Sequence, residues 1–212
     1  MNKTVIENII FDLDGVLVDA CEWHYESLNK ALIKNGFEAI TLSNHKKTFN
    51  GLPTKVKLKM IGLNNKEIEK VFFDKQDLTN KVIHDLCVHD TAKMDFLFSL
   101  KNKGIKIGCV TNSIRKTSMA MLSNSGIIDF IDTIISNEDV SEPKPNQEGY
   151  LKCMRLFLAK PSNTIIVEDS ENGIAAASKT GCSVWIVKNS TGVNEEGLDL
   201  FCTMSDLILK NG

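Results

Sequence analysis

Seven polar side chains in this sequence lie at the ends of apolar runs or, in one case, on the loop after such a run, and their chemical types suit work on a phosphate group. They are Asp12, Asp14, Thr111, Asn112, Lys144, Glu168 and Asp169. Carboxylates are hard oxygen ligands for a divalent cation. An ammonium and a hydroxyl group stabilise the negative charge on phosphate oxygens. The set therefore contains the groups that metal-assisted phosphoryl transfer needs.

The spacing of Asp12 and Asp14 requires positive charge nearby. Two carboxylates two residues apart cannot both stay charged beside a phosphate dianion unless a cation and Lys144 offset the repulsion. Mg²⁺ prefers an octahedron of hard oxygens and keeps some waters. We expect Asp12, Glu168, Asp169 and a backbone carbonyl near Asp14 to hold it.

This arrangement indicates a covalent route. Once the repulsion is screened, one aspartate can attack phosphorus and split hydrolysis into two displacements through an acyl phosphate. The neighbouring acid can protonate the leaving oxygen and then deprotonate water. Lys144 and Thr111 would stabilise the transferring oxygens, and Gly15 would let the chain turn away closely.

Each motif alone has a simpler explanation. A D-x-D-G stretch also opens calcium loops, but here the third ligand position is the apolar Val16, so we reject calcium. The Thr111-Asn112 pair taken singly is more often a helix cap, and Glu168-Asp169 resembles acids at a helix N-terminus. The phosphate interpretation depends on all the groups lying at one edge of a sheet.

The elements that must position these groups follow from the apolar pattern. A helical insert is predicted from about residue 20 to residue 89, after a buried strand at residues 5–11. Later strands are predicted at residues 105–110, 133–135, 164–167 and 183–187. Helices are predicted at residues 94–103, 116–125, 147–159 and near 173–180. Such alternation predicts an α/β fold with a parallel sheet, which binds ligands at the carboxyl ends of its strands.

The change of pattern divides the chain into two units. Residues 1–17 and 90–212 are predicted to form one discontinuous parallel-sheet core, and residues 18–89 a small all-helical domain inserted into it. The strand at residues 5–11 has no partner in the helical part, so it must rejoin the later sheet. The insert would then lie over the strand ends that carry the acids.

Composition sets limits on partners and location. The formal net charge of -2 gives no field for nucleic acid or an anionic membrane, and 42% hydrophobic residues is ordinary for a globular protein. The sequence has no apolar run of membrane-spanning length and no signal-peptide pattern, which favours the cytoplasm. Its six cysteines are interpreted as reduced and structural, and its histidines have no zinc-ligand spacing.

These residues resemble the haloacid-dehalogenase-like hydrolases, in the β-phosphoglucomutase and phosphoglycolate-phosphatase branch with a helical cap. Residues 11–19 (FDLDGVLVD) are similar to the first motif of this family and residues 110–113 (VTNS) to the second. The third corresponds to EPKPNQEGY and the fourth to VEDSENGIAAASKTG. The family usually has a proline and an aspartate where this chain has Gln147 and Glu148.

The resemblance implies a Rossmann-like core with a cap that closes over the active site. It places Asp12 as nucleophile, Asp14 as acid/base and Thr111 on the phosphate, with Lys144 as the third-motif lysine. The resemblance implies that Glu168 and Asp169 bind Mg²⁺ together with Asp12 and Asp14 of the first motif. Asn112 and, in the cap, Gly51, His24 and Lys75 are expected to contact substrate.

Two departures argue against a mutase. Mutases of this type carry a hydroxyl residue where this chain has Ala20, and a phosphate-gripping cap arginine where it has Thr54. On the other side, His24 lies where mutases use a histidine, and Lys55 and Lys75 are basic cap residues. For Lys75 a solvated helix face is the default expectation in so lysine-rich a chain.

The sequence therefore predicts a Mg²⁺-dependent phosphatase of a small phosphorylated metabolite, such as a sugar phosphate, acting through a phosphoaspartate on Asp12. A β-phosphoglucomutase-like phosphosugar mutase is the alternative. A retired, non-catalytic enzyme scaffold and a dehalogenase are disfavoured because every catalytic position holds a residue competent for phosphoryl chemistry. We expect a monomer or weak homodimer that binds neither nucleic acid nor membrane.

Overall fold

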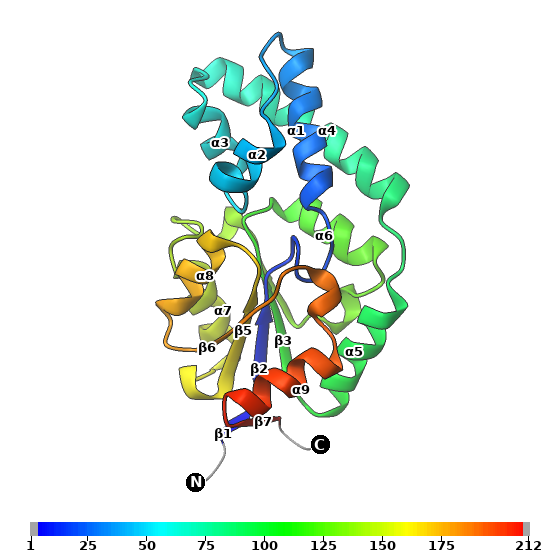
Figure 1. The fold of residues 1–212 in the computed structure, drawn as a ribbon, viewed down its shortest axis with the longest axis vertical. Helices are drawn as coiled ribbons and strands as arrows, with labels where there is room; N and C mark the ends of the chain where they lie inside the picture. Colours follow the sequence, from blue (N-terminus) through cyan, green and yellow to red (C-terminus); the bar gives the residue numbers. More distant parts are fainter. Residues whose placement is uncertain (1–3, 210–212) are drawn as a thin grey trace.

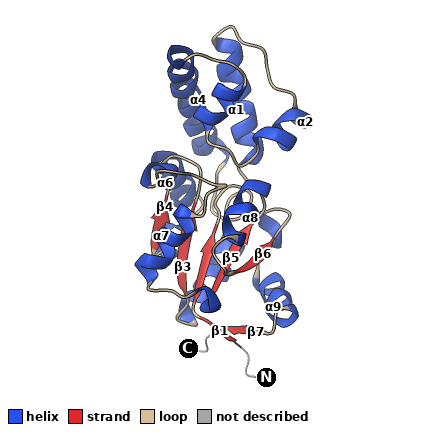
Figure 2. Cartoon of the chain, turned by 90° about the vertical axis from the view of Figure 1, so that its left-hand side faces the viewer, coloured by secondary structure: helices blue, strands red, loops and turns tan. Residues whose placement is uncertain are grey.

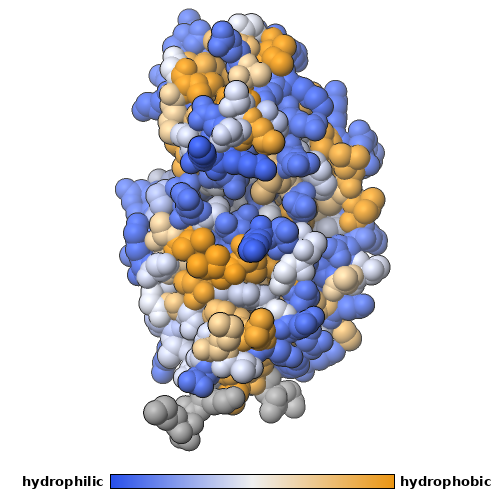
Figure 3. Space-filling view, viewed as in Figure 1, coloured by the Kyte–Doolittle hydropathy of each residue, from blue (hydrophilic) through white to orange (hydrophobic). Residues whose placement is uncertain are grey.

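The computed structural model describes residues 4–209 and has two parts, a core built on a parallel sheet and a helical cap above it (Figure 1). The predicted class, an α/β parallel-sheet core with an inserted helical cap, is confirmed. In the space-filling view a notch in the outline marks the level at which the two parts meet (Figure 3).

The central sheet has five parallel strands in the order β4-β3-β2-β5-β6. The strands are β2 (Asn8–Phe11), β3 (Lys106–Val110), β4 (Thr133–Ile135), β5 (Thr164–Glu168) and β6 (Ser183–Ile186). All residues of β2 and β5 are buried, as expected for the middle of a sheet that is covered on both faces. The order puts the carboxyl ends of β2, β3 and β5 side by side.

Helices cover both faces of this sheet, as the side view shows (Figure 2). Alternate residues of β2 point to opposite faces, so Ile9 and Phe11 join one buried cluster and Ile10 joins another. The first cluster includes residues of α5 (Thr91–Asn102), α6 (Arg115–Asn124) and α9 (Glu195–Met204). The second includes residues of α7 (Glu148–Phe157) and α8 (Glu171–Ser178). Short 3-10 turns are η2 (Ile128–Phe130), η3 (Asn137–Asp139), η4 (Pro161–Asn163) and η5 (Ser190–Gly192).

The prediction of a single strand over residues 5–11 is wrong in one respect, because Glu7 interrupts it and divides it into two strands. The first part, β1 (Thr4–Ile6), pairs with β7 (Leu207–Leu209) in a separate two-stranded sheet. Only β2 enters the main sheet. Glu7 is exposed between buried Ile6 and Asn8, which ends the buried run, and the partner strand lies about 200 residues further along the chain.

The cap is built on two long helices that pack together, α1 (Cys21–Lys34) and α4 (Asn65–Leu86). Shorter segments complete it: α2 (Leu42–Asn44), the π-helical turn η1 (His45–Phe49) and α3 (Thr54–Met60). Leu28, Leu32, Leu58 and Val71 contribute to a core of its own. None of the helices within residues 4–209 is long and apolar enough to cross a bilayer.

Candidate active site

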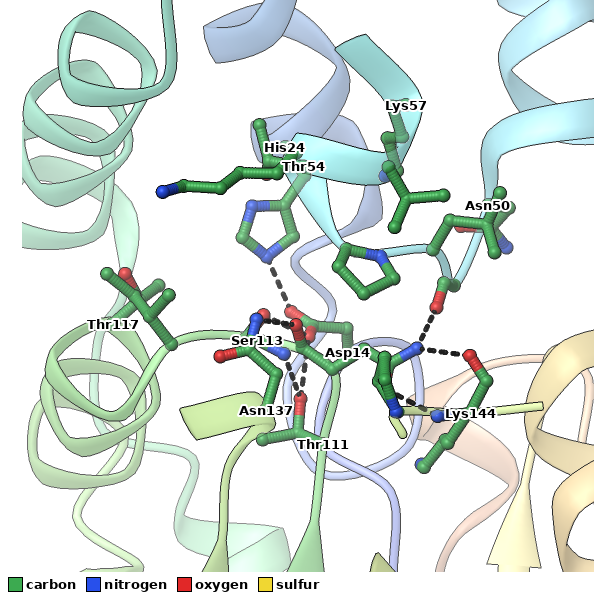
Figure 4. Close-up of a pocket in the computed structure, with 18 of the residues that line it drawn as sticks. Asp14, His24, Asn50, Thr54, Lys57, Thr111, Ser113, Thr117, Asn137 and Lys144 are labelled. Atoms are coloured by element: carbon green, nitrogen blue, oxygen red, sulfur yellow. Dashed lines mark hydrogen bonds and ion pairs between the residues drawn. The ribbon is translucent and has the colours of Figure 1, made fainter. Parts of the chain in front are cut away.

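The loops that follow β2, β3 and β5, together with the loop that carries Lys144, meet under the cap. They enclose a cavity of about 420 Å³ that is lined by residues of both parts. Figure 4 draws Lys57, Thr54 and His24 on the cap side of this cavity, with Asp14, Thr111 and Lys144 on the core side. The residues predicted from their positions after strands are therefore brought together.

Lys144 joins two carboxylates at the floor of the site. Its Nζ lies 2.6 Å from Asp12 Oδ1 and 2.6 Å from Glu168 Oε1. The hydroxyl of the fully buried Tyr150 donates a second hydrogen bond, of 2.5 Å, to Glu168 Oε1. The other oxygen of Glu168 accepts hydrogen bonds from the Asp169 and Ser170 amides. Glu168 is thereby held rigidly by its neighbours.

Burial and the closeness of several charged groups shift the pKa values of Asp12, Asp169 and Lys144. Burial raises the pKa of Asp12 well above its usual value, although Lys144 opposes this. Burial followed by Glu168 and Asp14 raises the pKa of Asp169 to about 7. Burial alone would lower the pKa of Lys144, but the Asp12 and Glu168 carboxylates outweigh it and raise that pKa. One ammonium does not neutralise so many acids.

The acids fit a divalent cation. Oxygen atoms of Asp12, Glu168 and Asp169 lie within 4.8 Å of one another. In the part of the chain that the structure describes, Asp169 Oδ1 is buried and has no hydrogen-bond partner, which is unusual for a buried carboxylate. Gly15 has a positive φ of 90°, and a side chain there would overlap the Asp169 carboxylate. An all-oxygen donor set with an orphaned anionic atom suits Mg²⁺.

The Asp14 side chain lies apart from this three-acid group and contacts the cap. Its Oδ1 lies 2.7 Å from His24 Nε2, and its Oδ2 accepts a hydrogen bond of 2.8 Å from Ser113 Oγ. Thr111 Oγ1 is 3.4 Å from the same oxygen. Burial opposes ionisation of Asp14, but His24 and the hydrogen bonds from His24 and Ser113 outweigh it and lower its pKa to about 2. Asp14 is therefore ionised at neutral pH.

His24 connects Asp14 to Lys75, which lies further into the cap. Lys75 Nζ is 3.0 Å from His24 Nδ1, so this nitrogen accepts and the Nε2–H donates to Asp14. Burial and then Lys75 lower the pKa of His24, consistent with a neutral ring. The expectation that Lys75 lies on a solvated helix face is wrong, because its side chain is 5% exposed and packed inside the cap.

Asn112 and Gly51 join the core to the cap. Asn112 Nδ2 donates to the Gly51 carbonyl at 2.6 Å and to the Lys144 carbonyl at 3.0 Å. Its Oδ1 accepts from the Lys144 amide at 3.0 Å. The Thr-Asn pair is not a helix cap here, since the N-cap residue before α6 is Ile114, and no side chain caps the helix. Asn112 therefore orders the lysine loop against the cap segment that contains Gly51.

Four further residues belong to the site that motif reasoning did not assign to it: Tyr150, Ser113, Lys57 and His45. Tyr150 and Ser113 lie inside the recognised motifs, so their polar groups next to predicted site residues are a signal that the sequence contains. Lys57 and His45 line the cavity from the cap. In the sequence they are a lysine and a histidine in a basic segment, with no local sign of burial.

Comparisons with known proteins agree with this fold. A family model described as haloacid dehalogenase-like hydrolase matches residues 9–187. The chain belongs to the haloacid dehalogenase-like hydrolase family.

Its relatives include phosphatases. Pyrophosphatase PpaX of Oceanobacillus iheyensis is 29% identical, over 87% of this chain and 86% of that protein. A phosphoglycolate phosphatase of Aquifex aeolicus is 28% identical, over 84% of each chain. The crystal structure of a β-phosphoglucomutase from Clostridium difficile superimposes with a TM-score of 0.81, at 22% identity, over 95% of this chain and 99% of that one. The family and these relatives make this chain a phosphohydrolase.

Proposed function

We propose that this protein is a Mg²⁺-dependent phosphomonoesterase that acts on a small phosphorylated metabolite through a phosphoaspartate on Asp12. One observation carries the proposal: three distant segments of the chain bring the buried Asp12, Lys144 and Glu168 and the half-buried Asp169 into one cluster at the floor of a capped cavity. The substrate is a soluble phosphate ester such as a sugar phosphate. We further propose a cytoplasmic monomer or weak homodimer without nucleic-acid or membrane partners.

In this mechanism Asp12 is the nucleophile. Asp12, Asp169, Glu168 and the backbone near Asp14 would hold Mg²⁺, which when bound supplies positive charge to the phosphate and to the acids around it. Lys144 Nζ, 2.6 Å from the nucleophile, orients Asp12 and balances its charge. The Thr111 hydroxyl binds a phosphate oxygen. Attack by Asp12 forms an acyl phosphate as the alcohol departs.

Asp14 transfers the protons: it is ionised in the free site, takes up the proton that a monoanionic phosphate ester brings, delivers it to the departing alcohol, and later accepts one from the attacking water. Its hydrogen bonds to Ser113 and His24 aim the carboxylate. His24 comes from the cap, so this orientation depends on the cap being closed. Lys75 maintains the neutral His24 tautomer that donates to Asp14. The orientation of Asp14 in the core is thereby coupled to closure of the cap.

The cap, residues 18–89, excludes bulk water from the site during attack. Three polar contacts support closure, namely Asn112 to the Gly51 carbonyl, Asn172 to the Asn50 carbonyl and His24 to Asp14. We assign Gly51 and Asn112 to substrate binding at this junction. A closed site strengthens every electrostatic interaction inside it.

A phosphosugar mutase is the second candidate, supported by the His24–Asp14 contact at the position where mutases use a histidine. Ala20 and Thr54 weigh against it. The two activities yield different products from a sugar 1-phosphate with a trace of the bisphosphate. A phosphatase releases inorganic phosphate, whereas a mutase yields the sugar 6-phosphate.

The proposal is tested by screening phosphate esters with and without Mg²⁺ on the wild type and on Asp12→Asn. We expect Mg²⁺-dependent phosphate release, reduced to background in Asp12→Asn while circular dichroism and thermal unfolding show a folded protein. Asp95→Asn, an exposed acid on α5, serves as the matched control and should retain activity. Full activity in Asp12→Asn, or no turnover of any ester by the wild type, would refute the proposal.

A further inference from the structure

Lys57 is a buried lysine at the cavity whose charge the protein leaves unmatched. It lies on α3 with a side chain 8% exposed, and Figure 4 shows it on the cap side of the pocket. Within residues 4–209 its ammonium makes no hydrogen bond and no ion pair, and only the more distant Asp14 and Cys21 act on its charge favourably. Buried charges are normally paired, so this one requires an explanation.

The other buried lysines of residues 4–209 show how the fold treats a structural ammonium. Lys93 donates to the carbonyls of Ser190 and Val193 at 2.7 and 2.5 Å. Lys144 binds two carboxylates, and Lys75 binds His24 Nδ1. A lysine that served only to stabilise the cap would be given acceptors in the same way. Lys57 instead presents its ammonium to the cavity that it lines.

The groups around Lys57 are also basic. Burial lowers the pKa of Lys57 to about 8, despite Asp14 and Cys21. Burial and then Lys57 lower the pKa of Lys75 to about 7. Burial and then Lys57 also lower the pKa of His45 to about 4, and His45 Nδ1 is itself buried without a partner in the described chain. Among the residues that the structure describes, the cap contributes no acidic side chain to the lining of the cavity.

We infer that Lys57 binds a second anionic group of the substrate, a carboxylate or a phosphate, at the cap end of the cavity while the phosphoryl group being transferred lies at Asp12. The inference rests on the proposed function and narrows it to substrates with two anionic groups. Lys144, next to Asp12, already serves the phosphoryl end. Lys57 is not at the position of the mutase arginine, which is Thr54 here, so the charge is supplied from a different place on α3.

The cavity has room for such a molecule. A volume of about 420 Å³ lies within the range of small-ligand sites. Its two ends differ in charge: the core end carries acids that could hold a metal ion, and the cap end carries the basic side chains of Lys57, Lys75 and His45. A molecule with a phosphate and a second anion separated by a short carbon chain would engage both ends at once. An ester with a neutral tail would engage only the core end.

The test uses substrate pairs that differ only in the second charge. The first pair is 2-phosphoglycolate and 2-hydroxyethyl phosphate. The second is propane-1,3-diol bisphosphate and its monophosphate, so the two pairs distinguish a carboxylate from a phosphate as the second anion. We expect wild-type kcat/KM to be roughly tenfold or more higher for the doubly anionic member of at least one pair, because a charge-assisted hydrogen bond is gained.

Variants assign this preference to Lys57. Lys57→Met should lower kcat/KM for the preferred diacid by roughly 10- to 100-fold, mainly through KM, and leave the neutral partner within about twofold. Lys57→Arg, which keeps the charge, should restore most of the preference. Lys59→Met removes an exposed lysine from the same helix and should behave as wild type.

Three results would overturn the inference: no wild-type preference in either pair, an equal loss on both members in Lys57→Met, or the same selective loss in Lys59→Met. The wild-type comparison decides the question even if Lys57→Met does not fold. Failure here is distinct from failure of the proposed function. If the enzyme hydrolyses both members of each pair equally through Asp12, the proposed phosphatase function stands and only the proposed second anion site is refuted.

Discussion

The two ends of the cavity treat buried charge in opposite ways. At the core end Lys144 is shared by Asp12 and Glu168, and Tyr150 completes the hydrogen bonding of Glu168. At the cap end Lys57 has no partner in the described residues. If the proposals hold, the proposed catalytic groups are organised before substrate arrives, whereas the substrate supplies the missing partner at the cap end. We propose that the core determines the type of reaction and that the cap determines the choice of substrate.

Removing the shared cation should have the largest effect. Lys144→Met leaves the buried Asp12 and Glu168 carboxylates without their common partner. We expect kcat to fall roughly 100- to 1,000-fold, as for other preorganised donors, and the free energy of unfolding to fall by about 3–5 kcal/mol. Steady-state kinetics and urea unfolding measure these. Lys188→Met, an exposed lysine, is the control. A Lys144→Met enzyme within tenfold of wild type would mean that the core end does not depend on this pairing.

The acid cluster depends on close packing behind it. A side chain at Gly173 would overlap the Glu168 carboxylate. Gly173→Ala should therefore raise the Mg²⁺ concentration for half-maximal activity by roughly 10- to 100-fold, as loss of outer-shell support does elsewhere. The comparison is Gly192→Ala, where an added Cβ meets nothing closer than 4.0 Å. Equal Mg²⁺ requirements in Gly173→Ala and Gly192→Ala would contradict the assignment of Glu168 to the metal site.

At the cap end a pH dependence should appear. Lys57, with a pKa of about 8, is charged below that pH and attracts an anion, and it becomes neutral as the pH rises through 8. Asp14 and Cys21 face it and favour its charge, whereas Lys75 and His45 are basic neighbours. KM for 2-phosphoglycolate should rise up to roughly tenfold between pH 7 and 9. KM for 2-hydroxyethyl phosphate, and both values in Lys57→Met, should stay flat, and a parallel rise for both esters contradicts the assignment.

The same contrast explains what could be predicted from the sequence. Asp12 and Thr111 directly follow strands, Glu168 ends β5, and Lys144 lies in the loop after β4. Strand order therefore brings these residues to one edge of the sheet. These residues can be predicted because each lies both in a sequence motif and at or near the end of a predicted strand. The fold class was predicted for the same reason, since strand and helix patterns are local.

What could not be predicted depends on distant packing. The break at Glu7 arises because β1 pairs with β7, near the other end of the chain. The burial of Lys57 and Lys75 follows from the packing of α3 and α4 within the cap and of the cap on the core. A lysine-rich helix has the same local pattern whether a given lysine meets water or a cavity. The residues at the cap end of the site therefore cannot be predicted from the sequence pattern alone.

The central claim, that Asp12 carries the phosphoryl group, can be measured by chemical trapping. The enzyme is mixed with substrate and Mg²⁺, quenched in acid within milliseconds and treated with borohydride, which reduces an acyl phosphate to an alcohol. Peptide mass spectrometry should then find homoserine at position 12, and only when substrate and Mg²⁺ are both present. Trapping at another residue, or intact Asp12 during rapid turnover, would contradict the account.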